Sequence, residues 1–156
     1  MLYVLTWWLT IELLGWLALP VSMRLFRWLP DRGYAFSKAL GLLLASYILW
    51  LGASLGLLRN DTGGILLSIL LVAGMSAWLV WRGQGWGELQ TYLRNNRTLI
   101  VAIAILFRVA FVLWAVVRAY ASFKIEPAGG EKFMEIAFLN AILRSPQFPP
   151  HDPWLS

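Results

Sequence analysis

Three carboxylic acids gather near the C-terminal end of the sequence, at Glu131, Glu135 and Asp152. Glu131 and Glu135 are four residues apart, so a helix would place both on one face, one turn apart. Carboxylates at a membrane–water interface can act as a general base or bind a divalent cation. We therefore predict a candidate catalytic site formed by these three acids. The plainer alternative is that the glutamates favour the first turn of a helix and that Asp152 only organises a turn.

Two charges fall inside long apolar stretches, Glu12 in the first stretch and Arg108 in the last. A lone charge at the centre of a bilayer costs about 3 kcal/mol or more, so each charge must face protein or water. We predict that Glu12 and Arg108 form an intramembrane pair, which would pack the first stretch against the last. The alternatives are a protonated Glu12 and an Arg108 that extends its guanidinium to the membrane surface.

The composition identifies the class of protein that must position these groups. The 156 residues are 60% hydrophobic and 13% charged, with a mean hydropathy of +0.67. A soluble domain of this length has too little interior for so many apolar side chains, and disorder requires low hydrophobicity. The sequence has no cysteine and one histidine, which excludes a disulfide framework and a thiolate or multi-histidine metal site. We predict an all-α, polytopic transmembrane helix bundle.

Four apolar stretches are each long enough to span a membrane: residues 2–23, 34–58, 65–81 and 99–120. In the second stretch, Gly52 and Gly56 have the spacing that lets helix backbones approach closely, although chance explains this spacing equally well in a glycine-rich chain. The sequence thus predicts a transmembrane four-helix region over residues 1–120. The remainder, residues 121–156, is predicted to be an extracytoplasmic loop.

Basic residues predict the orientation of these spans. The first and third connections carry seven lysines and arginines, whereas the second carries only Arg59. Because basic loops stay in the cytoplasm, we expect a plasma-membrane protein whose N-terminus and C-terminal loop are extracytoplasmic. Basic residues of that loop weaken the contrast: Lys124, Lys132 and Arg144. We interpret residues 82–97 as a cytoplasmic segment near anionic lipid or a plain solvated loop, and we expect membrane lipids, not nucleic acid, as partners.

The last part of the chain is its least apolar part. A breaker, Pro-Ala-Gly-Gly at 127–130, precedes a predicted amphipathic helix at 131–144. Most positions of this helix are apolar, so we expect it to lie at the membrane surface or against the bundle. The stretch Phe-Pro-Pro-His-Asp-Pro-Trp at 148–154 has too much proline for a helix or a strand and predicts a rigid, extended loop.

The stretch EKFMEIAFLNAILR at 131–144, followed by FPPHDPWL at 148–155, closely resembles the YYY family of multi-pass membrane proteins. That family shows a pattern like EKxMDxAFLNAIxRSxxFPPxDPWxxG, followed by a tyrosine-rich run. Glu135 stands where the family pattern has Asp, so the carboxylate is kept. The tyrosine-rich run and the later spans of the family do not follow Ser156. The resemblance therefore implies that this chain is the N-terminal part of a longer protein.

The layout of that family is similar to the GT-C glycosyltransferases, membrane enzymes that use polyprenyl-phosphate-linked sugars. In those enzymes an acid lies in the first large external loop, just after a span and at the start of a juxtamembrane helix. Glu131 has the matching position here. The resemblance implies that Glu131 takes the proton of the acceptor, while Glu135 and Asp152 assist it or hold a metal ion. It also implies that basic groups meet the lipid phosphate: Lys132, Arg144 and His151.

The leading functional hypothesis is therefore the N-terminal part of a membrane glycosyltransferase with a polyprenyl-phosphate sugar donor. Two other functions stay open. A transporter or flippase would use Glu12 and Arg108 along a polar path through the membrane. A non-catalytic membrane scaffold would need none of these groups beyond their contribution to stability.

Overall fold

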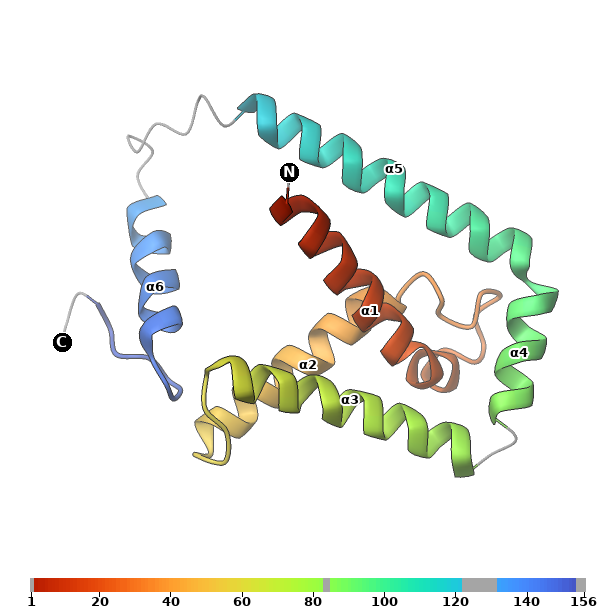
Figure 1. The fold of residues 1–156 in the computed structure, drawn as a ribbon, viewed down its shortest axis with the longest axis horizontal. Helices are drawn as coiled ribbons and strands as arrows, with labels where there is room; N and C mark the ends of the chain where they lie inside the picture. Colours follow the sequence, from red (N-terminus) through yellow and green to blue (C-terminus); the bar gives the residue numbers. More distant parts are fainter. Residues whose placement is uncertain (1, 83–84, 122–131, 154–156) are drawn as a thin grey trace.

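The computed structural model describes residues 2–82, 85–121 and 132–153. These residues form six α-helices and no strand (Figure 1). The helices are α1 (Leu2–Leu25), α2 (Ser37–Ser54), α3 (Thr62–Arg82), α4 (Gly85–Asn95), α5 (Arg97–Ala121) and α6 (Lys132–Arg144). The predicted all-α class is therefore confirmed.

Four of the described helices, α1, α2, α3 and α5, are long and apolar enough to cross a membrane. Each coincides with one predicted apolar stretch, although the ends differ by a few residues; α2, for example, begins at Ser37 and ends at Ser54. The chain is thus a polytopic membrane protein, and its apolar helix faces lie in a lipid environment.

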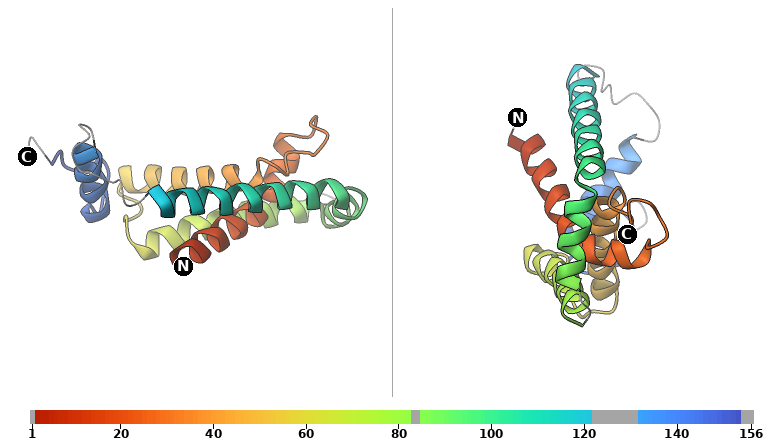
Figure 2. Two further views of the ribbon diagram at one scale, coloured as in Figure 1. Left: turned by 90° about the horizontal axis from the view of Figure 1, so that it is seen from above. Right: turned by 90° about the vertical axis from the view of Figure 1, so that its right-hand side faces the viewer.

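Successive spans alternate in direction, so the connections fall at two opposite ends of the molecule (Figure 2, left). The α1–α2 connection (26–36) and α4 lie at one end, which we call the arginine-rich end. The α2–α3 connection (55–61) and α6 lie at the other, which we call the tail end. A hydrogen bond of 2.8 Å from the backbone nitrogen of Asn60 to the carbonyl oxygen of Pro146 joins these last two segments.

Small residues bring α1, α2 and α3 into close contact. The buried positions of α2 recur every four residues at Ser37, Gly41 and Ala45, and those of α3 follow the same spacing from Gly64 through Ser68. A side-chain carbon added at Gly41 would collide with the backbone carbonyl of Leu14 on α1. Because lipid provides no hydrophobic force between helices, this close backbone approach is what holds the three spans together.

Gly52 and Gly56 do not form the helix-packing motif that their spacing suggested. The helix α2 ends at Ser54, and Gly56 lies in the following turn with a φ of 72°. That left-handed conformation is open to glycine and costly for other residues. Gly52, in the last turn of α2, faces Leu58 of the α2–α3 connection and not a neighbouring helix. Both glycines therefore shape the turn at the tail end.

The α1–α2 connection folds back along α1 instead of leaving the bundle. The hydroxyl of Ser22 donates a hydrogen bond of 2.6 Å to the carbonyl oxygen of Gly33. The ring of Tyr34 packs edge-on against Trp16, with 6.3 Å between the ring centroids. As a result, α2 begins beside the middle of α1 and not beside its end.

Helix α4 holds this connection from the other side. The phenol of Tyr92 donates a hydrogen bond of 2.6 Å to the backbone carbonyl of Asp31. Burial raises the pKa of Tyr92 to about 12, and the nearby charge of Asp31 adds to this rise. The phenol therefore keeps its proton over the physiological range and remains a donor. The sequence analysis did not predict this helix.

Helix α5 stands apart from the packed core. Its apolar window has a mean hydropathy of 2.8, the highest of the four spans, but only 6% of that window is buried. Ile100 and Ile103 pack against a buried cluster near the arginine-rich end, formed by Leu19, Met23, Tyr34 and Tyr92. Most of the α5 surface is apolar and exposed, as expected for a helix that faces lipid.

The close contact at Gly41 yields a stability prediction. An Ala in place of Gly normally stabilises a helix by about 0.5–1 kcal/mol. We expect Gly41→Ala to destabilise the protein instead, by about 1–3 kcal/mol, because the added carbon meets the Leu14 carbonyl. Gly74→Ala on α3 is the matched control, since nothing lies within 4 Å of its added carbon. Unfolding by sodium dodecyl sulfate in mixed micelles measures both. Equal stability of the two variants would contradict the packing.

Candidate functional site

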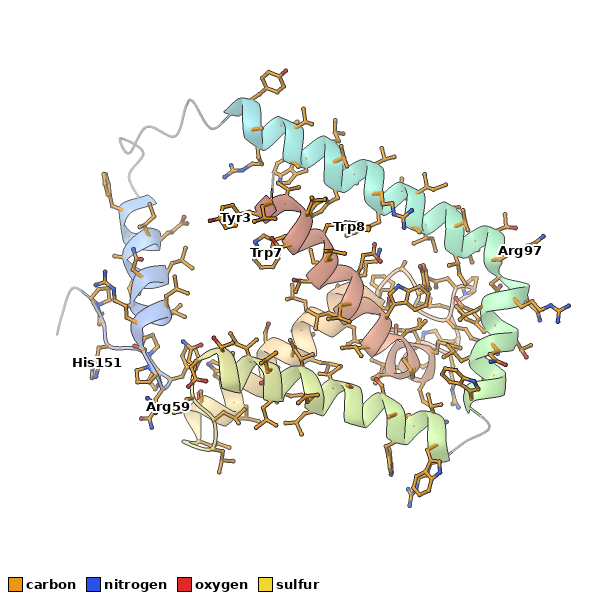
Figure 3. The ribbon with its side chains drawn as sticks, viewed as in Figure 1. Tyr3, Trp7, Trp8, Arg59, Arg97 and His151 are labelled. Carbon is orange, nitrogen blue, oxygen red and sulfur yellow. The ribbon has the colours of Figure 1, made fainter. Side chains whose placement is uncertain are left out.

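The predicted tail site lies at the tail end of the molecule. Glu135 is in the first turn of α6 and is exposed, and Arg144 is exposed in the last turn. Glu131 lies outside the described residues, and Lys132 begins α6. Beyond α6, His151 is exposed and Asp152 is partly buried. Figure 3 shows His151 and Arg59 at this same end.

The described residues do not by themselves bring the predicted tail groups into one cluster. Glu135 and Arg144 are nine residues apart on α6, which places them on opposite faces of the helix. Within the described ranges, no group of three or more acids and histidines is close enough to hold a metal ion. The role of Glu131 in such a cluster stays a prediction.

Asn60 fixes the position of the tail, which the sequence analysis did not anticipate. Its side-chain amide donates hydrogen bonds to the carbonyl oxygens of Ile142 at 2.7 Å and Ser145 at 3.0 Å. These carbonyls are at the end of α6, where the last carbonyl groups of a helix have no backbone N–H partner within the helix. The neighbouring Asp61 caps the start of α3 by accepting from the nitrogen of Gly64 at 2.8 Å. The only sequence signal was an Asn-Asp pair in a turn.

Glu12 has a partner that the sequence did not suggest. Its carboxylate lies 2.7 Å from the ammonium of Lys38, the second residue of α2. Both side chains are largely buried, with 17% of Glu12 and 11% of Lys38 exposed. The same ammonium lies 3.7 Å from the ring centroid of Phe107 on α5. Lys38 thus connects three spans around one buried charge pair.

Arg108 lies beside a different group. Its guanidinium carbon is 5.6 Å from the ring centroid of Trp8 on α1, a cation–π distance. The ion pair of Glu12 in the described part of the chain is therefore with Lys38, while Arg108 contacts the same helix through an aromatic ring. Arg108 thus makes a direct contact between α5 and α1, and Lys38 of α2 bridges the same two helices. The pairing of Glu12 with Arg108 itself stays a prediction.

The folded-back α1–α2 connection explains why Lys38 reaches Glu12. From its place in the sequence, Lys38 is expected among the loop charges at the arginine-rich end. In the structure, the connection returns along α1 and delivers Lys38 beside Gly15, one helical turn from Glu12. The sequence does not show how deep in the membrane a lysine at the start of an apolar stretch lies, because the path of the preceding loop determines that depth.

A double-mutant cycle distinguishes the two candidate partners of Glu12. Removing one member of a mostly buried ion pair costs about 3–5 kcal/mol, because the other charge is left without a partner. We expect Glu12→Gln and Lys38→Met to be strongly non-additive in unfolding experiments, and Glu12→Gln and Arg108→Met to be nearly additive, within about 0.5 kcal/mol. A larger coupling to Arg108 than to Lys38 would reverse this assignment.

Comparison with known proteins places this fold in a family. No curated protein and no solved structure matches the chain. A family model described as an uncharacterized membrane protein, DUF2298, matches residues 44–156. The match includes most of α2, the spans α3 and α5, the helix α4 and the whole tail, which is more than half of the sequence. The chain therefore belongs to the DUF2298 family of membrane proteins.

Proposed function

We propose that this chain forms the membrane scaffold and the first large extracytoplasmic loop of a glycosyltransferase that uses a polyprenyl-phosphate-linked sugar. The observation that carries the proposal is the anchoring of α6 by Asn60. This contact holds the last turn of an acid-bearing helix at the tail end, and the helix follows the span α5 in the chain. The resemblance of the tail to the YYY family and the GT-C layout supports the same assignment.

The distribution of arginines supports an extracytoplasmic tail. The arginine-rich end carries six of them: Arg24, Arg27, Arg32, Arg82, Arg94 and Arg97. The tail end carries three in the described part of the chain: Arg59, Arg118 in the last turn of α5 and Arg144 in the last turn of α6. Removal of Lys38 from the count, because it is paired inside the bundle, leaves this contrast in place. The positive-inside rule then directs the arginine-rich end to the cytoplasm.

The proposed chemistry is a displacement at the anomeric carbon of the sugar. The carboxylate of Glu131 takes the proton of an acceptor hydroxyl, and the acceptor oxygen forms a bond to the anomeric carbon. The bond between that carbon and the phosphate oxygen breaks, and its electron pair leaves with the lipid phosphate. Lys132, Arg144 and His151 neutralise the charge that develops on this phosphate. Glu135 and Asp152 orient the acceptor or hold a divalent cation.

A transporter or flippase is the second candidate, and the buried Glu12–Lys38 pair favours it. Ionisable groups inside membrane spans often mark a path for ions or polar substrates. In this structure the pair is enclosed by α1, α2 and α5, through Phe107, which also suits a purely structural role. The two functions differ in which carboxylate is required, Glu12 or Glu131.

The orientation is tested by labelling introduced cysteines, since the sequence contains none. Gln147 at the tail end and Thr91 on α4 are both exposed. We expect a membrane-impermeant maleimide to label Gln147→Cys in intact cells and to label Thr91→Cys only after lysis. The opposite result would place the tail in the cytoplasm and would remove the proposed reaction from its required side of the membrane.

The proposed reaction is tested with membranes that carry the protein. Polyprenyl-phosphate mannose and polyprenyl-phosphate glucose, radiolabelled in the sugar, serve as donors, and the loss of label from the lipid fraction is measured. We expect Glu131→Gln to slow this loss by about 10²–10⁴-fold at an unchanged amount of protein, because the general base is removed. Glu126→Gln, in the same loop, is the matched control and should retain activity.

A transporter predicts the opposite pattern for the same variants. Glu12→Gln would then abolish function, and Glu131→Gln would have little effect. Equal activity of Glu131→Gln and the unmodified protein would rule out the proposed general base.

A further inference from the structure

A cavity opens at the arginine-rich end, far from the tail. Its volume is about 620 Å³, which is within the range of small-ligand sites. The end of α1, the α1–α2 connection, the end of α3 and the start of α4 form its walls. Figure 1 shows these segments converging at the end of the molecule where α4 turns the chain from α3 to α5.

The polar part of the cavity wall is strongly cationic. Arg24, Arg27 and Arg32 line it together with a single carboxylate, that of Glu88. This carboxylate is 2.5 Å from Arg32. Among the described residues, Arg24 and Arg27 have no acidic partner within 4.0 Å, so two positive charges at the wall are uncompensated. The planar guanidinium group of arginine binds phosphate through paired hydrogen bonds.

The backbone holds Arg32 at the cavity in a conformation that arginine rarely adopts. Its φ is 44°, in the left-handed region, and Gly33 follows with a φ of 77°. The carboxylate of Asp31 stabilises this turn by accepting from the nitrogens of Gly33 at 3.1 Å and Ala35 at 2.9 Å. A left-handed backbone conformation costs a residue other than glycine about 1 kcal/mol or more, and such residues are found preferentially at binding sites. The turn therefore presents Arg32 toward α4 and the cavity.

The rest of the wall is apolar. Met23 of α1 and Leu79 and Val80 of α3 line the cavity beside the arginines. Trp28 also lines it and is 71% exposed, as expected for an indole at a membrane surface. A wall that combines free guanidinium groups with aliphatic side chains suits an amphipathic ligand. Its anionic head would meet the arginines, and its chains would lie along the spans.

We propose that this cavity binds the phosphate headgroup of an anionic phospholipid from the leaflet at the arginine-rich end. Basic pockets between membrane helices are known to take such headgroups. The inference does not depend on the proposed glycosyl transfer, because it concerns different residues at the opposite membrane surface. Free phosphate shares the headgroup chemistry but cannot use the apolar wall.

The test uses the purified, delipidated chain and native mass spectrometry. Phosphatidylglycerol and phosphatidylcholine with identical acyl chains are titrated separately, and bound lipid is counted. We expect phosphatidylglycerol to bind more tightly. The double variant Arg24→Gln/Arg27→Gln should weaken its binding by about 25-fold, from about fivefold for each arginine. Circular dichroism verifies that the variant keeps its helices.

Two further variants control for charge and folding. Arg94→Gln/Arg97→Gln removes the same charge from the same end but does not alter the cavity wall, and Figure 3 shows Arg97 pointing away from the helices. We expect this variant to change the affinity for phosphatidylglycerol by about twofold or less. Glu88→Gln should strengthen binding by about fivefold, because it releases Arg32 from its ion pair.

Several results would overturn the assignment. Equal binding of the two lipids, or equal losses in the two double-arginine variants, would reduce the cavity to a general cationic surface. Weaker binding of phosphatidylglycerol by Glu88→Gln would contradict the proposal that Arg32, once released from its ion pair, binds the headgroup. This test holds even if the Arg24→Gln/Arg27→Gln variant does not fold. Full displacement of phosphatidylglycerol by inorganic phosphate would identify a site for free phosphate instead of lipid.

Discussion

The carboxylate of Glu12 requires a cation at its own depth within the membrane bundle, and much of the structure follows from that requirement. Lys38 supplies the cation at 2.7 Å. To deliver it, the 26–36 connection returns along α1 and is tied there by the Ser22 hydroxyl and the Tyr92 phenol. The start of α2 consequently packs against the middle of α1, where small residues allow the backbones to approach. The pairing of Glu12 with Lys38 and the small residues between the two helices thus determine the same contact between α1 and α2.

The two ends of the molecule carry different chemistry. At the tail end, Asn60 satisfies carbonyl groups at the end of α6 and so fixes an acid-bearing helix beside the α2–α3 connection. At the arginine-rich end, guanidinium groups surround a cavity that α4 closes from one side. Phosphate chemistry is proposed at both ends, for a sugar donor at one surface and for a structural lipid at the other. Helix α5 links them and exposes its apolar surface to lipid.

The candidate site could be predicted only in part from the sequence. The acids of the tail and the short helix that carries Glu135 follow from spacing and from the motif, and α6 forms where it was expected. The contact that positions this helix could not be found in the same way, because Asn60 and Ser145 are far apart in sequence and each is ordinary in a turn. Glu131 lies outside the described residues, so its place in the site stays a prediction.

The sequence by itself determined the class of protein, the number of spans and the alternation of their connections. These properties depend on local hydropathy, because any apolar stretch of about 20 residues must satisfy its backbone as a helix in lipid. Only the tertiary structure decided which cation meets Glu12, which glycines form helix contacts and that three arginines share one cavity. Each of these depends on the path of a short connection. A path of that kind is set by distant hydrogen bonds, such as that of Tyr92 to Asp31, and local residue patterns do not encode them.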